Sequence, residues 1–294
     1  MTRQQLHPLC LLFVILVLLL TRHYWVNTMP EYLLAAAGVF LTGIPHGAMD
    51  HHTASFLNGT RFKLLRYLLL YLVSALLYLA VWFIYPAVAF LLFLGFTAWH
   101  FGETDSMCFG QKKIPAVLIF IYGWSLLMWL LLKDAATILY WTDLITGHHH
   151  FSQQLIQALT TIPHLLWFVL LSVLLLYMTE RKKWLSALLF LVFIFCAVHT
   201  SLLMGFVVYF AGWHSLQALH HLRTSVFQRT GIKQIFLHAL PAIAGSLVLL
   251  FIILRFGTGG WIENNGLPSL FVLLSVLTLP HMVQMHKLYQ FRLK

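Results

Sequence analysis

The stretch YLLAAAGVFLTGIPHGAMDHH, residues 32–52, begins as an apolar run and ends in three histidines and an aspartate. An apolar run of this length is typical of a helix that crosses a lipid bilayer. Ionisable side chains are costly inside a bilayer, so their presence at the end of such a helix indicates a functional site. The stretch therefore predicts a membrane fold with a site built into it.

The composition of the whole chain agrees with a membrane fold. Of the 294 residues, 61% are hydrophobic and only 9% are charged, whereas soluble domains carry about 25% charged residues. We expect an all-α fold in which residues 1–294 form a single transmembrane domain, a polytopic helical bundle. The net charge of +10 is interpreted as a topology signal and does not indicate nucleic-acid binding.

Apolar runs separated by Pro, Gly or charged residues predict about eight to ten membrane-spanning helices. The candidate ranges are 7–26, 32–49, 67–85, 87–103, 114–133, 163–179, 184–199, 201–222, 234–254 and 267–287. If the N-terminus is cytosolic, 15 of the 18 Lys and Arg residues fall in segments on the cytosolic side. The positive-inside rule therefore favours this order of spans, with both termini in the cytosol.

Four of the 17 histidines lie at one depth in the predicted bundle. His46, His100, His214 and His281 each come about 13 or 14 residues into a span that runs inward, or roughly 20 Å below the outer surface at 1.5 Å per residue. Four neutral imidazoles at one level can chelate a divalent transition metal, and imidazole suits Fe, Zn, Cu and Ni. The sequence thus predicts a metal site between helices.

Two acidic residues and a fifth histidine follow candidate ligand histidines on the same predicted helices. Asp50 is four residues after His46, and Glu103 is three residues after His100. Each carboxylate is predicted to accept the free ring N–H of a ligand histidine, although both also fit a solvated helix end. His221 is the alternative fourth ligand, on the same face as His214 but about 10.5 Å further along the helix.

Four short blocks of sequence, in this order, carry a resemblance to a known family. They are PHGAMDHH (45–52), AWHFGETD (98–105), YFAGWHSL (209–216) and TLPHM (278–282). In this order the blocks resemble those of the bacterial and archaeal Brp/Blh-type integral-membrane β-carotene 15,15′-dioxygenases.

This resemblance implies an enzyme with non-haem Fe(2+) that uses O2 to cleave the central double bond of β-carotene into two retinals. It also implies a bacterial cytoplasmic membrane location and a retinal-binding rhodopsin as an acceptor of the product. His46, His100 and His214 match the family's ligand positions. The family has a further histidine four residues after His214, where this chain has Ala218, so the fourth ligand is either His281 or His221.

Aromatic residues adjoin the expected ligands, and two interpretations of them are open. They either line a tunnel for the polyene or serve as bundle packing and interfacial anchors. The residues are Trp99, Phe101, Tyr209, Phe210 and Trp213.

Two other functions are compatible with the histidines. A di-iron membrane desaturase or hydroxylase would use the histidines near the cytosolic surface, among them His51, His52 and His220. A carotenoid-binding or transport protein without catalysis would use buried histidines with Asp50 and Glu103 to pass protons or ions.

Overall fold

In the computed structural model, residues 3–110, 113–227, 232–256 and 267–293 are described, and every regular element among them is helical. The α-helices are α1 (Arg3–Trp25), α2 (Met29–Gly38), α3 (Ile44–Ala48), α4 (Asp50–Asn58), α5 (Leu64–Ile84), α6 (Pro86–Phe109), α7 (Ala116–Leu131), α8 (Ala135–Thr146), α9 (His149–Thr160), α10 (His164–Met178), α11 (Trp184–Ala197), α12 (Leu202–Val207), α13 (Ser215–Ser225), α14 (Ile232–Phe256) and α15 (Leu267–Arg292). Shorter segments are the π-helices η1 (Val39–Gly43) and η5 (Val208–His214) and the 3-10 turns η2 (Gly59–Arg61), η3 (Leu132–Asp134) and η4 (Arg181–Lys183).

Eight helical stretches in the described part of the chain are long and apolar enough to cross a membrane, or nine if the bent pair α9 and α10 forms one span. These helices are compatible with a multi-pass membrane protein. The number lies within the eight to ten spans predicted, and each of the ten candidate ranges falls on a helix. The ranges 163–179 and 184–199 are not among the eight, because α10 has 15 residues and α11 has 14.

The helical path continues beyond two of the predicted spans. The span predicted to end at residue 49 ends with α3 at Ala48, and α4 follows after a turn at Met49, whereas the helix of the span predicted to end at residue 103 continues to Phe109. The predictions stopped there because acidic residues follow, yet Asp50, Glu103 and Asp105 are all buried. Each carboxylate accepts hydrogen bonds from side chains of other helices, so the helices can continue without exposing the acidic groups to lipid.

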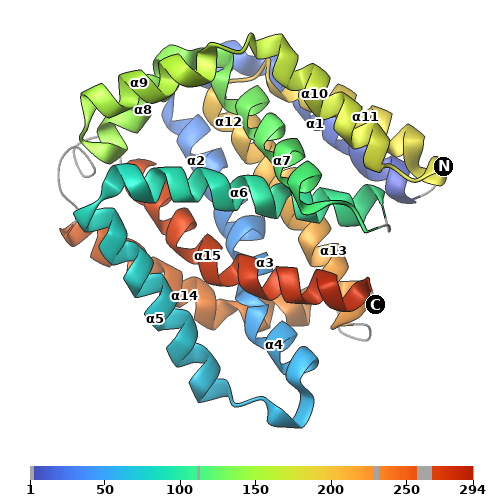
Figure 1. Ribbon diagram of the computed structural model, residues 1–294, viewed down its shortest axis with the longest axis vertical. Coiled ribbons are helices and arrows are strands. Elements are labelled where there is room, and N and C mark those ends of the chain that lie inside the picture. The colour runs from blue at the N-terminus through green and yellow to red at the C-terminus, as the bar shows by residue number, and fades with distance from the viewer. Residues whose placement is uncertain (1–2, 111–112, 228–231, 257–266, 294) are drawn as a thin grey trace.

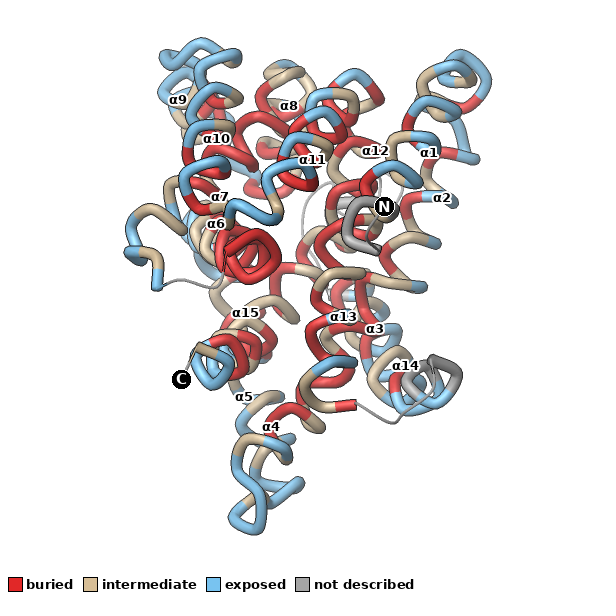
Figure 2. Tube along the Cα trace, turned by 90° about the vertical axis from the view of Figure 1, so that its right-hand side faces the viewer, coloured by how far each residue is buried: buried red, intermediate tan, exposed pale blue. Residues whose placement is uncertain are grey.

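The long helix α6 runs through the middle of the bundle (Figure 1). On one side it packs against α7, which in turn contacts α10, and on the other it packs against α5 and α15. Helices α1 and α11 pack together, and α14 contacts α3. Buried residues concentrate on the faces that these helices turn toward one another, while α1, α5 and α14 expose apolar residues on their outer faces (Figure 2).

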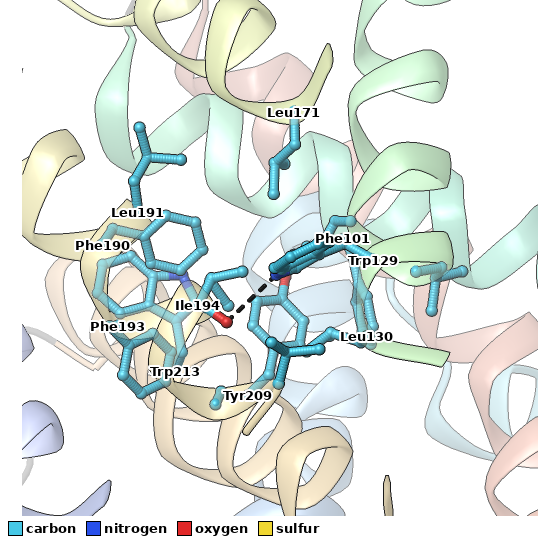
Figure 3. Packing of buried hydrophobic residues seen from close by; sticks show 14 of the residues in the cluster. Phe101, Trp129, Leu130, Leu171, Phe190, Leu191, Phe193, Ile194, Tyr209 and Trp213 are labelled. Atoms are coloured by element: carbon cyan, nitrogen blue, oxygen red, sulfur yellow. Dashed lines mark hydrogen bonds between the residues drawn. The ribbon is translucent and has the colours of Figure 1, made fainter. Parts of the chain in front are cut away.

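Aromatic side chains form much of the core between α6, α7, α11 and η5. Trp213 lies beside Phe190 and Phe193, and Tyr209 lies between this group and Phe101 (Figure 3). The ring centroids of Trp213 and Phe190 are 4.4 Å apart, and those of Phe101 and Tyr209 are 4.9 Å apart. This core places the π-helix η5 firmly against α6.

Glycines set the closest helix crossing, between α6 and α7. A β-carbon at Gly123 would lie 1.8 Å from the carbonyl oxygen of Ala98, and one at Gly102 would lie 2.1 Å from that of Ile119. Small residues allow such backbone approach between membrane helices. The crossing therefore requires glycine at both positions.

We predict that Gly123→Ala lowers the free energy of unfolding by roughly 1–3 kcal/mol or more, because the new methyl group meets backbone atoms that cannot rotate away. Gly95→Ala is the matched control, since nothing lies within 4 Å of a β-carbon at Gly95 in α6. Thermal unfolding of the detergent-solubilised variants measures both effects. Equal stability of the two variants would contradict the role of the crossing.

Candidate metal centre

Four elements bring their histidines to one place in the bundle. His46 lies on α3, His100 on α6, His214 at the end of η5 and His281 on α15. All four side chains are buried, with at most 5% of their surface exposed. The ring centroids of His46 and His281 are 4.7 Å apart, those of His281 and His100 are 4.9 Å apart, and those of His100 and His214 are 4.7 Å apart.

The ring centroids of His214 and His46 are 5.4 Å apart, so the four imidazoles form a closed circle. Nitrogen atoms of His46, His100 and His281, one from each ring, all lie within 4.8 Å of one another. His214 is outside this tightest group of three but adjoins two of its members. We call the four rings the histidine cluster.

The π-helices η1 and η5 carry two members of the histidine cluster into position. They lie against one another: the hydroxyl of Thr42 donates to the carbonyl of Ala211 at 3.1 Å, and a β-carbon at Gly43 would lie only 2.7 Å from the ring of Phe210. An extra residue per turn rotates the side chains that follow, and π-helical segments are frequent at functional sites. Here one precedes His46 by three residues and the other ends at His214.

Most ring nitrogens of the histidine cluster have no hydrogen-bond partner although they are buried. Both nitrogens of His100, both of His214 and Nε2 of His281 are in this state. Leaving a buried polar atom unpaired costs roughly 1–3 kcal/mol, so several such atoms in one place make this a candidate site for a ligand. A neutral imidazole nitrogen offers a lone pair, which a metal cation can accept.

The remaining hydrogen bonds orient two of the rings for this role. Nδ1 of His281 lies 2.9 Å from the Asp50 carboxylate, and Nδ1 of His46 lies 3.3 Å from the carbonyl oxygen of Thr42. Both oxygens only accept, so each Nδ1 carries the proton and each Nε2 keeps its lone pair. Ligand histidines in metal sites commonly have this arrangement. The donor set therefore fits a transition metal that prefers imidazole.

The two acidic residues predicted to support the cluster occupy different places. Asp50 accepts from His281 and from the hydroxyl of Tyr71 at 3.3 Å. It therefore contacts one of the four histidines predicted as ligands, which lies on another helix and is not His46. The Glu103 carboxylate lies 2.6 Å from Nδ1 of His286 on α15, so its partner is His286, where the spacing had indicated His100.

His221, the alternative fourth ligand, points away from the histidine cluster. Its Nε2 lies 3.4 Å from the sulfur of Cys108, and a guanidinium nitrogen of Arg292 lies 2.6 Å from its Nδ1. The side chain of His281 occupies the fourth place in the circle of rings.

A large apolar cavity adjoins the cluster. It has a volume of about 460 Å³, and all four histidines line it, together with residues of α5, α6, α14 and α15. Of the five aromatic residues named from the sequence, Phe101 and Phe210 line it. Tyr209 and Trp213 instead pack in the core, and Trp99 lies near His286.

This cavity has a mouth on the apolar surface of the protein. Its most exposed lining side chains are Leu68, Leu72 and Leu76 on α5 and Val248 on α14, which are between 46% and 60% exposed. Beside Val248, Gly245 also lines the cavity and leaves open space around its α-carbon. The mouth between α5 and α14 therefore opens on an apolar surface, which is compatible with a position inside a membrane.

A further buried carboxylate near the cluster escaped the sequence analysis. Asp105 accepts hydrogen bonds from Trp213 Nε1 at 2.8 Å, from the Tyr122 hydroxyl at 2.9 Å and from the Tyr209 hydroxyl at 3.2 Å. It thereby ties α6 to α7 and to η5, directly beside His214. Only three-dimensional proximity reveals this role, because the donors are 17 to 108 residues away along the chain.

Comparison with known proteins bears directly on this site. The sequence model of the family described as beta-carotene 15,15′-dioxygenase matches residues 37–289. The chain belongs to this family. The matched region includes all four members of the histidine cluster and both π-helices.

One characterised relative carries the same description. The chain is 26% identical over 266 residues to the "Beta-carotene 15,15′-dioxygenase" of uncultured marine bacterium 66A03, an alignment that covers 85% of this chain and 90% of that protein. No solved structure matches the chain. Family membership supports an oxygenase-type enzyme and implies a carotenoid substrate.

We predict that Asp105→Ala strongly lowers the stability of the protein, because three buried donors lose their acceptor at a cost of roughly 1–3 kcal/mol each. Tyr122→Phe is the milder comparison. It removes one donor and should lower the free energy of unfolding by about 1 kcal/mol, because the carboxylate keeps two partners. Denaturation of the purified variants measures the difference. Wild-type stability of Asp105→Ala would show that this carboxylate does not fix η5.

Proposed function

We propose that the protein is a non-haem Fe(2+) enzyme that uses O2 to cleave the 15,15′ double bond of β-carotene, giving two molecules of retinal. The observation that carries the proposal is the histidine cluster, in which most ring nitrogens are unpartnered and all four side chains line an apolar cavity that is open between α5 and α14. The family match and the relative's name supply the substrate class and the reaction type.

The proposed reaction needs no reductant, which agrees with a sequence that shows no motif for a nucleotide cofactor. One O2 adds one oxygen atom to each carbon of the central double bond, the carbon–carbon bond breaks, and two aldehydes form. No electrons from a separate reductant are needed, and no nucleotide-binding motif is visible in the sequence. Iron bound by the histidine cluster would supply the activation of O2 that a closed-shell polyene requires.

The residues of the chain then have separate tasks. The four imidazoles hold the cation, and Asp50 keeps the His281 ring in the tautomer that leaves Nε2 free. The apolar lining excludes water, and Phe101 and Phe210 offer flat surfaces to a conjugated chain. A substrate that dissolves only in lipid would reach the cluster sideways through the mouth, without leaving the membrane.

The surroundings of the enzyme are part of the same proposal. Its place is the bacterial cytoplasmic membrane, with cytosolic termini as the distribution of Lys and Arg indicates. A retinal-binding rhodopsin in that membrane would accept the product.

The two alternative functions receive less support. Within residues 3–110, 113–227, 232–256 and 267–293, one group of at least three metal-capable side chains is found, which consists of His46, His100 and His281. A di-iron desaturase would need a larger set, and His221 is engaged with Cys108 and Arg292. A carotenoid-binding protein without catalysis would not require unpartnered buried imidazoles.

Expression in a bacterium that accumulates β-carotene tests the proposed reaction. We predict that the wild-type protein bleaches the cells and forms two retinals for each carotene lost, as quantified by chromatography of pigment extracts. His46→Ala should abolish cleavage, because it removes one imidazole from the histidine cluster. His150→Ala, which alters an exposed histidine of α9, is the matched control and should cleave like the wild type.

Two outcomes would contradict the reaction. Unchanged carotene with folded, iron-loaded wild-type protein would reject β-carotene as the substrate. Full cleavage by His46→Ala would reject the histidine cluster as the site.

We predict that Asp50→Ala weakens metal binding by about 10–100-fold, because His281 loses the acceptor that orients its ring. Asp50→Asn should lose less metal affinity, because the amide oxygen can still accept a hydrogen bond from Nδ1 of His281. The metal dissociation constant is measured by competition with a chelator. Glu103→Ala serves as the control and should keep wild-type affinity, because Glu103 pairs with His286.

A further inference from the structure

A second, smaller cavity lies beyond the one that adjoins the histidine cluster. Its volume is about 180 Å³, and its walls come from α2, η1, α6, α7, α8, α9, α12 and α15. No histidine and no charged side chain is among the described residues that line it, and Tyr140 is the one that is exposed. We call it the inner cavity, and the larger one the outer cavity.

The two cavities share a wall. Phe93, Phe206 and Leu274 line both of them. Each precedes a histidine of the cluster along the same helical run: Phe93 is seven residues before His100, Leu274 seven before His281, and Phe206 eight before His214. At 1.5 Å per residue the shared wall is about 10–12 Å from the histidines.

The shared wall is also in contact with the cluster through stacked rings. Phe206 stacks on Phe210 with centroids 6.0 Å apart, and Phe210 stacks on His214 with centroids 5.9 Å apart. On the opposite side Phe93 packs edge-on against Phe271 at 4.7 Å, a residue that lines the inner cavity. The side chains of Phe93, Phe206 and Leu274 thus belong to the wall that the two cavities share.

We propose that the inner cavity is a binding site for the terminal ring and adjoining chain of one half of a linear carotenoid, which reaches it past Phe93, Phe206 and Leu274. The proposal rests on the proposed function and adds how the cleavage position is chosen. The inserted end meets the wall of the inner cavity, and the distance from there to the histidine cluster decides which double bond lies beside the cluster.

The chemistry and shape of the two cavities favour this occupant. A conjugated polyene is stiff and apolar, so it needs a long path without charged groups, and the inner cavity extends the outer one in this way. A symmetric substrate cut at its centre needs room for two halves. The inner cavity would receive one half, while the other lies in the outer cavity and its mouth between α5 and α14.

Filling the inner cavity tests the proposal. Leu144→Trp on α8 and Leu155→Trp on α9 each add an indole to partly buried lining positions, and Ala136→Trp adds the same group at an exposed position of α8 outside the lining. Each variant is assayed with β-carotene and with an apocarotenal that keeps one ring and is shortened at the other end.

With β-carotene, the amount of retinal formed by the filled variants should fall by about tenfold. Alternatively, they should form pairs of unequal aldehydes, because the substrate cannot insert far enough to place its central double bond beside the cluster. With the shortened apocarotenal, whose reduced end still fits, they should cleave like the wild type, which also shows that they are folded. Ala136→Trp should resemble the wild type with both substrates.

Wild-type yields of retinal from β-carotene in both filled variants would overturn the proposal. An equal loss on both substrates would also overturn it, because the effect would then not depend on the length of the inserted end. A wild-type protein that cleaves neither substrate would instead refute the proposed function itself.

Discussion

Buried imidazole nitrogens without hydrogen-bond partners are the constraint on which the structure of this site depends. Once removed from water, each such nitrogen must accept a hydrogen bond, donate one, or give its lone pair to a cation. The rings of His46, His100, His214 and His281 lie side by side, and most of their nitrogens have no partner. The proposed cation would satisfy several of them at once, which would explain why four costly side chains are tolerated together in an apolar bundle.

The rest of the fold can be understood as support for that cluster. The π-helices η1 and η5 turn His46 and His214 inward, and their close contact at Gly43 and Phe210 couples the two. Asp105 ties η5 to α6 and α7, while the glycine crossing brings α7 close to α6. The cavity opens between α5 and α14, so the same bundle encloses the cluster and leaves it accessible from the apolar surface.

Much of this organisation was predictable from the sequence, because hydropathy and helical rise are one-dimensional properties. Counting residues along apolar runs placed four histidines at one depth, and the structure brings these four together. Partners on other helices were not predictable in this way. Spacing along one helix placed Asp50 one turn from His46 and Glu103 one turn from His100, whereas the carboxylates contact His281 and His286 of α15. The eight long apolar helices lie within the eight to ten spans predicted, and two of the ten candidate ranges fall on the shorter helices α10 and α11.

X-ray absorption at the iron edge of the purified, iron-loaded protein tests the central claim most directly. If the histidine cluster binds iron, we expect one iron per chain with about four imidazole nitrogens and no sulfur as its ligands. In His281→Ala the iron should have one imidazole ligand fewer. A first shell dominated by carboxylate oxygen or sulfur, or a spectrum unchanged in His281→Ala, would contradict it.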